Sequence, residues 1–335
     1  MKLKNVAMNL GLLAITTVLF FGGIEVALRM TGLQRTKPNP PQIYRVSEDP
    51  RISYELIPDI SRKAYREKVT TNSQGFRSPE LDLAKETVVM LGDSIAFGYG
   101  IKDEETLAAQ LQERIPEYNF LNTAAPGYHL GMQTALYQTK LRDLDPAMVM
   151  LVFHYNDFDV QTGWLDETGI IRAPDWVPTD PECSPVTEGM LKYMPGKCWL
   201  DLHSAFYKAV KKVVNMRVAQ EALEETREME VLAPREEVTD MQMQLYFVQL
   251  KRISAMLPEG MPRVFVLWPD RFLHSTTKPK LIAEAEKNGF LVIDLYETFG
   301  NNVEVLGWDT VHPSAKAVEE AAEVIAGKVG PLLSD

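Results

Sequence analysis

Three features of the amino-acid sequence predict an α/β protein, namely a three-layer α/β/α sandwich on a five-stranded parallel sheet, preceded by a transmembrane helix. First, an uncharged run of 20 residues, Asn5–Ile24, lies near the start of the chain. Second, short apolar runs alternate with segments of helical periodicity from about residue 86 onward. Third, these apolar runs are continuous and rich in β-branched residues, as in parallel strands that are covered on both faces.

The length and composition of the chain are those of a folded globular protein. Its 335 residues fit one large domain with insertions or two ordinary domains, and 45% apolar with 24% charged residues exclude wholesale disorder. The formal net charge is −11, and residues 1–37 contain five Lys or Arg and one acid, so the remainder carries −15. A body this acidic binds polyanions poorly, which argues against nucleic acid as a partner. Two cysteines and five scattered histidines form no metal-ligand pattern, so we expect neither a metal site nor a cofactor.

The N-terminal run predicts a membrane anchor within residues 1–25. As a helix at ~1.5 Å per residue, Asn5–Ile24 spans roughly 30 Å, the hydrocarbon thickness of a bilayer. Lys2 and Lys4 precede it, as in a signal sequence or a signal anchor. We favour an uncleaved anchor, because Gly22–Glu25 offers only a weak cleavage site. A cleaved signal and a buried or interfacial helix remain as alternatives.

The compartment is indicated by two cysteines, because basic residues lie on both sides of the anchor and do not orient it. Long C-terminal domains are translocated largely regardless of such charges. Cys183 and Cys198 lie 15 residues apart, and a disulfide between them would contribute ~3 kcal/mol in the chain-entropy model and needs an oxidising compartment. The alternative is two unrelated reduced thiols. Together these observations favour an extracytoplasmic body, in the periplasm or at the cell surface.

The segment between the anchor and the main domain, residues 26–85, is rich in Pro and polar residues and has little periodicity. We expect an extended, loop-rich connector that lies on the main domain or lifts it off the membrane.

The main domain is expected over residues 86–335, with right-handed crossovers between its strands. The expected strands are Thr87–Leu91, Tyr118–Leu121, Met148–Phe153, Val264–Trp268 and Leu291–Leu295. The expected helices are Glu104–Ile115, Leu130–Leu144, Met241–Leu257, Lys278–Asn288 and Pro313–Val329.

One stretch breaks the alternation of strands and helices. About 110 residues separate the third and fourth strands, far more than a crossover needs. Phe158–Lys197 is loop-like and contains two of the five tryptophans, and Leu202–Val231 is predicted to be a long amphipathic helix. We therefore expect an inserted cap at about residues 158–240 and not a second folding domain.

A serine and a histidine occupy positions that suit nucleophilic catalysis. Ser94 follows the first predicted strand directly, at the edge of a parallel sheet where ligands bind. Asp309 precedes His312 by three residues in a loop ahead of the last helix. A serine hydroxyl needs a neighbouring base, and that base needs a carboxylate to orient it. Taken singly, Ser94 is most simply a turn residue and His312 a surface residue, but together they predict a catalytic triad.

Two further residues lie at strand ends where the same cleft would form. Gly127 follows the second strand and can turn its backbone N–H into the cleft, and Asn156 follows the third and offers a side-chain amide. With the N–H of Ser94 they would make an oxyanion hole, in which each donor contributes ~2.7–4 kcal/mol. A turn glycine and a strand-end cap are the plain alternatives.

At these four positions the chain resembles the SGNH (GDSL-type) hydrolases, a superfamily of esterases, lipases, carbohydrate deacetylases and some O-acyltransferases with a flavodoxin-like fold. Gly92-Asp93-Ser94 matches the nucleophile block, and Asp309-Thr310-Val311-His312 the Asp-x-x-His block. The resemblance covers roughly residues 86–330. It implies Ser94 as nucleophile, His312 as base, Asp309 as its orienting acid, and Gly127 and Asn156 as oxyanion donors.

The chain departs from the family pattern at His154, which stands where the third block usually has glycine. Upstream, Asn72–Arg77 is similar to the lead-in of membrane-anchored members. The α/β-hydrolase fold shares the order Ser, Asp, His, but its nucleophile motif requires a glycine where this chain has Ala96.

The sequence therefore predicts a membrane-anchored, extracytoplasmic serine esterase acting on acyl or acetyl esters of envelope glycans or lipids. One alternative is an O-acyltransferase that passes the same acyl-enzyme to a glycan hydroxyl. Another is a non-catalytic envelope scaffold that retains the fold. Protein partners are not predicted.

Overall fold

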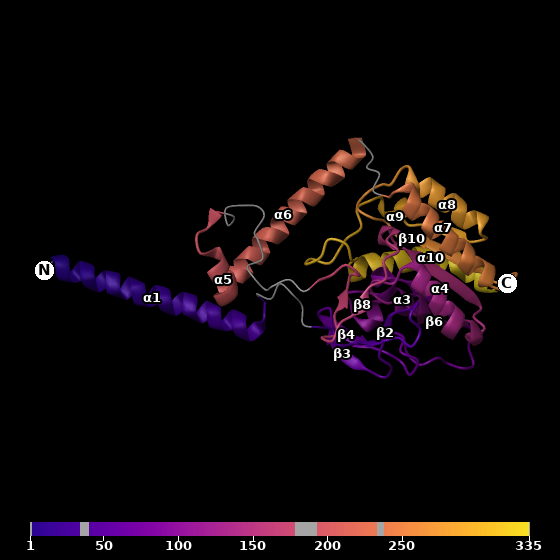
Figure 1. The fold of residues 1–335 in the computed structure, drawn as a ribbon, viewed down its shortest axis with the longest axis horizontal. Coiled ribbons are helices and arrows are strands. Elements are labelled where there is room, and N and C mark those ends of the chain that lie inside the picture. The colour runs from indigo at the N-terminus through magenta and orange to yellow at the C-terminus, as the bar shows by residue number, and fades with distance from the viewer. Residues whose placement is uncertain (1, 34–39, 178–192, 233–237, 335) are drawn as a thin grey trace. The chain divides into compact units, whose positions relative to one another are not determined.

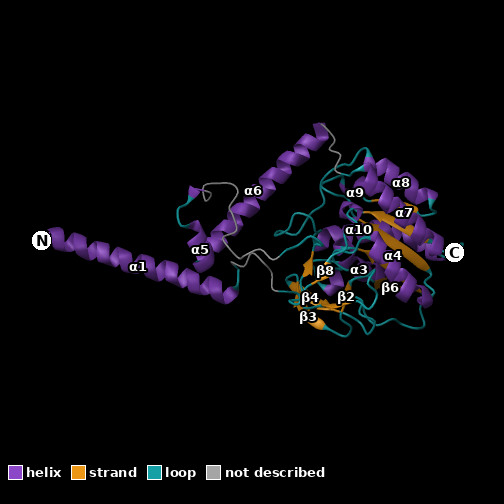
Figure 2. Ribbon diagram, in the orientation of Figure 1, coloured by secondary structure: helices purple, strands orange, loops and turns teal. Residues whose placement is uncertain are grey.

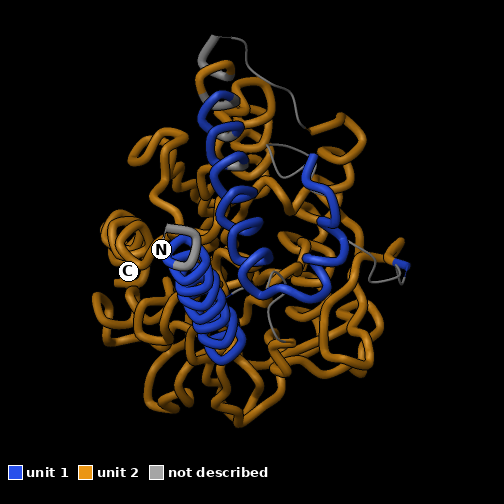
Figure 3. The backbone as a smooth tube through the Cα atoms, turned by 90° about the vertical axis from the view of Figure 1, so that its left-hand side faces the viewer, with its two compact units in different colours: residues 1–39, 177–226 blue, residues 40–176, 227–335 orange. Residues whose placement is uncertain are grey.

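In a computed structural model of the chain, the structure describes residues 2–33, 40–177, 193–232 and 238–334 (Figure 1). The chain forms two compact units (Figure 3). One combines residues 1–39 with residues 177–226, and the other combines residues 40–176 with residues 227–335.

The second unit contains the predicted parallel sheet, whose strands are orange in Figure 2. Its strand order is β11-β10-β7-β5-β6. The first strand, β5, lies between β6 and β7, so that Val88 pairs with Phe120 on one side and Met148 on the other. Every residue of β5, β6 and β7 is buried, as expected for strands covered on both faces. The strands span Thr87–Gly92 (β5), Asn119–Asn122 (β6), Met148–Phe153 (β7), Arg263–Leu267 (β10) and Leu291–Asp294 (β11).

Helices cover the two faces and complete the predicted sandwich. α3 packs against α10, and α4 packs against α7. Thr239 begins α7 with a capping box: its hydroxyl accepts from the Gln242 N–H, and the Gln242 side chain accepts from the Thr239 N–H. The helices span Ser94–Phe97 (α2), Leu107–Arg114 (α3), Leu130–Leu136 (α4), Asp240–Met256 (α7), Thr277–Lys287 (α8), Tyr296–Phe299 (α9) and Ala315–Ser334 (α10).

The segment expected to be an extended connector is folded from residue 40 onward. It contains two antiparallel hairpins, Tyr44–Val46 (β1) with Tyr54–Leu56 (β2) and Ser61–Ala64 (β3) with Glu67–Thr70 (β4). Ile43, Ile52, Tyr54 and Leu56 are buried in the same apolar core as the sheet.

Arg77 connects this segment by hydrogen bonds to the end of α2 and to the loop that follows it. Its buried guanidinium donates to the carbonyl groups of Phe97, Gly98 and Ile101 and forms an ion pair with Asp103 at 2.9 Å. The segment therefore belongs to the body that carries the sheet, and residues 34–39 lie outside the described part of the chain.

The insertion expected at residues 158–240 is divided between the two units. Its first part forms a small hairpin, Trp164–Leu165 (β8) with Ile171–Arg172 (β9), within the unit of the sheet. Residues 177–226, which include Lys197–His203 (α5) and most of Ala205–Leu232 (α6), group with the N-terminal helix instead. The one long helix expected here is interrupted at Ser204. Cys183 lies outside the described residues, so its disulfide with Cys198 stays a prediction.

The N-terminal helix, Lys2–Thr31 (α1), is longer than the predicted anchor. Its stretch Asn5–Thr31 is long and apolar enough to cross a membrane, and an 18-residue window within it has a mean hydropathy of 2.0. An anchor and a signal sequence both fit these properties.

Candidate active site

Ser94 is the first residue of α2 and lies directly after β5. Asp93 caps this short helix, because its Oδ1 accepts a hydrogen bond from the Ile95 N–H at 2.9 Å. A side chain at Gly92 would approach the Ala96 Cβ to 2.6 Å and the Val152 carbonyl to 3.0 Å. The close packing of α2 on the sheet therefore requires glycine at position 92, and it fixes the serine at the carboxyl edge of the sheet.

The structure brings the three residues of the predicted triad together, although 218 positions separate Ser94 from His312. The Ser94 Oγ lies 3.0 Å from His312 Nε2, and His312 Nδ1 lies 2.9 Å from Asp309 Oδ2. These distances suit proton transfer from the hydroxyl to the imidazole and an Nδ1–H bond to the carboxylate.

The loop that carries Asp309 and His312 is held by its own backbone. The Leu306 N–H donates to the His312 carbonyl at 2.9 Å, and Val305 forms an isolated bridge with Pro313. Asp309 Oδ1 accepts from the N–H groups of Val311 and His312 at 2.8 and 3.0 Å. One loop thus holds both the acid and the histidine next to Ser94.

The ionisation state of Asp309 suits an orienting role. Burial raises the pKa of its carboxyl, but hydrogen bonds from the His312 side chain and from the backbone of His312 and Val311 outweigh burial. They lower the pKa of Asp309 from 3.8 to about 2. The carboxylate is therefore charged at neutral pH and favours the His312 tautomer with its proton on Nδ1, which leaves Nε2 free to accept.

Aromatic rings support His312 from one side, which the sequence analysis did not foresee. The ring of Tyr99 stacks on the imidazole at 4.0 Å between centroids, and Trp308 lies next to Tyr99. A side chain at Gly100 would lie 2.7 Å from the Trp308 ring and 2.5 Å from Leu306. Gly100 therefore allows the loop after α2 to pack against the loop that carries His312.

Asn156 is held from two directions at the end of β7. Its Nδ2 donates to Asp93 Oδ2 at 2.7 Å, and its Oδ1 lies 2.9 Å from His154 Nδ1. Because an amide oxygen only accepts, His154 must carry its proton on Nδ1 to make this bond. One of the two amide N–H groups of Asn156 is then used by Asp93, and the other is left for a ligand. Asn156 is itself exposed.

Gly127 lies in the loop after β6, next to the strand that leads to Ser94. It is exposed and has a φ of +81°, a conformation that L-amino acids with side chains rarely adopt. A side chain here would also come within 2.7 Å of the Tyr54 hydroxyl, which donates to the Pro126 carbonyl. Tyr54 from β2 thus supports the loop that presents Gly127.

Asp157, beside Asn156, is fully buried. Burial and the nearby charge of Asp93 raise the pKa of its carboxyl well above the usual range, against a weaker opposing bond from the His154 N–H. Its Oδ2 accepts from this N–H at 3.3 Å, whereas Oδ1 has no hydrogen-bond partner among the residues that the structure describes.

A second pair of acid and histidine lies at the end of β10. His274 Nε2 is 2.9 Å from Asp270 Oδ2, and its ring stacks on Tyr155 at 3.5 Å between centroids. His274 is one of the five scattered histidines of the sequence, and its spacing of four residues from Asp270 in a loop does not predict this contact. Neither residue contacts Ser94, so we assign the pair no chemical role.

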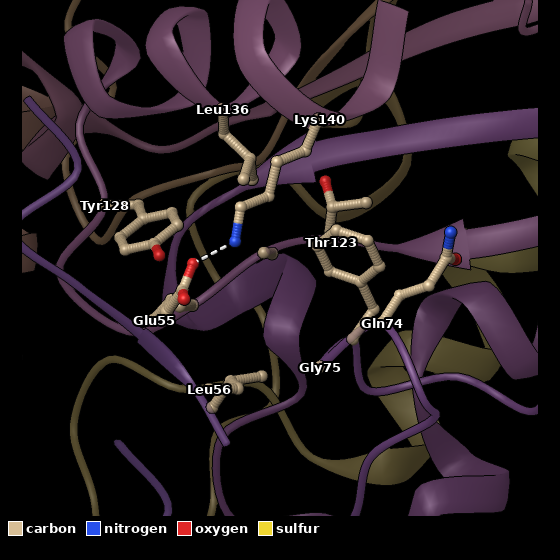
Figure 4. A pocket seen from close by; sticks show the side chains of 11 residues that line it. Glu55, Leu56, Gln74, Gly75, Thr123, Tyr128, Leu136 and Lys140 are labelled. Carbon is tan, nitrogen blue, oxygen red and sulfur yellow. Dashed lines mark hydrogen bonds and ion pairs between the residues drawn. The ribbon is translucent and has the colours of Figure 1, made fainter. Parts of the chain in front are cut away.

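The structure also contains a small cavity lined by both polar and apolar side chains, and none of the triad residues lines it (Figure 4). The ion pair between Glu55 and Lys140 lies in its wall, and Thr123 precedes the Gly127 loop nearby. Across the described part of the chain, no cluster of three or more His, Cys, Asp or Glu could hold a metal ion.

Comparisons with known proteins give distant likenesses only. No family profile matches the chain, and no curated protein matches it. Similar solved structures include the psychrotrophic esterase EstA from Pseudoalteromonas sp. (11% identity, 75% of this chain and 100% of that one, TM-score 0.44). They also include a lipase/acylhydrolase from Enterococcus faecalis (14% identity, 73% and 95%, TM-score 0.41). A third is a member of the lipolytic G-D-S-L family from Veillonella parvula (13% identity, 72% and 97%, TM-score 0.39). These are hydrolases of the kind that the sequence motifs resemble, but likenesses of this strength carry no argument about activity.

Proposed function

We propose that this protein is a membrane-anchored serine esterase that hydrolyses carboxylic esters of envelope glycans or lipids outside the cytoplasm. The observation that carries the proposal is the continuous chain of contacts from the Ser94 hydroxyl through His312 to Asp309. The apolar helix α1 supports the anchored state. Acyl or acetyl groups are the expected substrates, because the triad chemistry acts on ester carbonyls.

In the acylation half-reaction, Ser94 Oγ attacks the carbonyl carbon of the ester while His312 Nε2 takes the hydroxyl proton. The carbonyl π electrons move onto oxygen. The backbone N–H groups of Ser94 and Gly127 and the second amide N–H of Asn156 are the donors for this oxyanion. When the intermediate collapses, the bond to the alcohol breaks, and His312 gives its proton to the departing alkoxide.

Water resolves the acyl-enzyme in the second half-reaction. His312 removes a proton from water as the water oxygen attacks the acyl carbon. Collapse then breaks the bond to Ser94 Oγ, returns the proton to serine and releases the carboxylic acid. Asp309 stabilises the imidazolium in both halves but keeps its negative charge, in line with its lowered pKa.

The proposal is tested by labelling with a fluorophosphonate probe, which forms a covalent adduct with activated serines. We expect rapid labelling of the wild-type chain, none of Ser94→Ala, and normal labelling of the control Ser73→Ala, which changes an exposed serine of the same unit. Labelling of Ser94→Ala at the wild-type rate would contradict the assignment.

A further inference from the structure

The N-terminal helix α1 is bonded to the start of α6 through Glu25. The Glu25 carboxylate accepts from the N–H groups of Ala205 and Phe206 at 2.7 and 2.9 Å and from the Ser204 hydroxyl at 3.2 Å. These N–H groups have no partner within a helix, and the positive end of the helix dipole attracts the carboxylate. Glu25 therefore caps α6 from another helix.

Neighbouring residues extend this contact along the last turns of α1. Arg29 forms an ion pair with Glu25 at 2.7 Å and donates to the His203 carbonyl at 2.6 Å. The ring of Phe21 meets that of Phe206 edge-on at 5.3 Å. The polar contacts thus begin where the uncharged run of α1 ends, at Ile24.

This position places α5 at the boundary between membrane and water, if α1 spans the bilayer as proposed. A bilayer that covers Asn5–Ile24 reaches its polar surface at about Glu25. α5 ends at His203, whose carbonyl binds Arg29, so the helix lies level with this surface within the unit that contains both (Figure 1).

The side chains of α5 suit such a surface. Trp199 is 63% exposed and Leu202 is 55% exposed, and a spacing of three places them on one face of the helix. Tryptophan is enriched where membrane meets water, because its ring is apolar and its N–H is polar. The Trp199 ring stacks on His203 at 4.9 Å between centroids, and most of its surface stays exposed.

The charge along α5 and α6 changes sign with distance from α1. Residues 197–217 contain five Lys or Arg and one acid, whereas residues 221–230 contain five Glu and one Arg. Lys211 is buried and forms an ion pair with the one acid, Asp201, so four basic residues remain in the first stretch: Lys197, Lys208, Lys212 and Arg217. At ~1.5 Å per residue, the acidic stretch begins roughly 24 Å from the start of α6. Anionic head groups attract basic side chains and repel acidic ones over about a Debye length. The basic part is the part that is bonded to α1.

We propose that α5 and the basic half of α6, residues 197–217, bind the surface of an anionic phospholipid bilayer, with Trp199 and Leu202 inserted among the head groups. The inference rests on the proposed anchoring by α1 and adds a second membrane contact to it. The unit of α1, α5 and α6 (Figure 3) is then a membrane-docking unit distinct from the unit that carries Ser94. Continuity with α1 favours lipid over a protein partner as the occupant of this face.

The test uses the full chain in vesicles of equal parts phosphatidylcholine and phosphatidylglycerol, in which the acyl chains of one lipid are brominated near the head group. Bromine quenches nearby tryptophans, so we expect clear quenching in the wild-type chain. That quenching should be lost in Trp199→Phe and kept in the control Trp164→Phe, which changes an exposed tryptophan of the other unit. Replacing all phosphatidylglycerol by phosphatidylcholine should weaken the quenching, and Lys208→Glu with Arg217→Glu should do the same.

Several results would overturn the inference. Equal quenching in the wild-type chain and in Trp199→Phe would show that Trp199 does not contact lipid. Unchanged quenching in vesicles of phosphatidylcholine alone would show that the contact does not need an anionic surface. Unquenched Trp199 in a chain that sediments as a dimer would assign the face to a second copy. If vesicles do not retain the chain after an alkaline wash, the proposed anchoring by α1 is contradicted as well. Ester hydrolysis in the same vesicles tests Ser94 separately.

Discussion

Asn156 shows how a few hydrogen bonds prepare a donor for a ligand before any ligand arrives. Asp93 holds one of its N–H groups and His154 holds its carbonyl oxygen, so the amide cannot rotate without losing both bonds. A donor that is already oriented costs no reorganisation when charge develops on the substrate. His154, the departure from the family pattern, thereby acts as a positioning residue in our account.

The role of His154 can be measured. In His154→Leu the Asn156 carbonyl loses its partner, so we expect kcat for a small acetate ester to fall by roughly tenfold with little change in KM, as for a weakened oxyanion donor. His203→Leu, a histidine of the other unit, should leave kcat unchanged. A rise in KM at constant kcat would mean that His154 shapes substrate binding and not the oxyanion hole.

The lowered pKa of Asp309 leads to a prediction about pH. Because this carboxyl titrates at about 2, its protonation contributes no loss of activity between about pH 4 and pH 9. The contribution of this carboxylate to stability is complete above the unfolded pKa of 3.8 and is lost as the pH falls toward 2.

The variant Asp309→Asn tests this carboxylate. We expect it to lose about 10²–10⁴-fold in kcat. The difference in Tm from wild type should be constant at neutral pH and shrink below about pH 4.

A Tm difference between wild type and Asp309→Asn that does not change down to about pH 2.5 would show that the Asp309 carboxyl is not stabilised by the His312 loop. Full activity of the variant would show that His312 needs no carboxylate to orient it.

At this scale the sequence predicted that Ser94, Asp309 and His312 lie together, which they do, but not the groups around them. Ser94, Asp309 and His312 follow from residue type and from position at strand ends. Tyr99, His154 and Asp93 act through contacts between separate loops. Single residues of these types form no periodic pattern from which such contacts could be predicted.

At the scale of elements, the strands of the parallel sheet were predicted, including the four-residue β6 and β11, whereas the hairpins of β1–β4 were not. β5 and β7 are six residues each and fully buried, so their pattern is unambiguous. β1–β4 are three or four residues long, and their buried positions are too few to show alternation, so residues 40–85 resembled a connector. The break at Ser204 and the capping of α6 by Glu25 depend on a contact across about 180 residues, which no local pattern encodes.

The division into units leads to a prediction about the anchor. Ser94, Asp309 and His312 all lie in the unit of residues 40–176 and 227–335. A chain that begins at Pro38 should therefore keep the wild-type kcat on a small soluble ester, although the loss of α1 exposes Phe206 and the start of α6. Circular dichroism and turnover in mild detergent check this expectation. Loss of folding would show that α1 supports the sheet.

At the scale of the whole molecule, the pairing of the two cysteines tests the predicted extracytoplasmic location. Titration of free thiols in the unfolded, unreduced chain should find none if Cys183 and Cys198 are paired, and two titratable thiols would remove this argument for an extracytoplasmic location. If they are paired, reduction should change KM for large substrates more than reactivity toward a small probe, provided that the insertion acts as a cap. Unchanged kinetics on both kinds of ester would exclude a cap.

In our account the two units of the molecule have separate roles. We propose that one unit holds the bilayer through α1 and, as inferred above, through α5 and the start of α6. In the same proposal the other unit hydrolyses esters, with residues from the ends of three strands and from the loop before α10. A substrate that is itself part of the envelope would then be met by an enzyme held at a surface and not free in solution.

The central claim is that Ser94, activated by His312, forms an acyl-enzyme, and the most direct measurement is turnover with a trapped intermediate. Purified wild type and Ser94→Ala are each mixed with p-nitrophenyl acetate, and the products are quenched in acid and analysed by peptide mass. The account predicts an acetyl group on the peptide of Ser94 in wild type, and a fall in kcat of at least about 10³-fold in Ser94→Ala. Hydrolysis by Ser94→Ala at the wild-type rate, with no acetylated peptide in either protein, would contradict it.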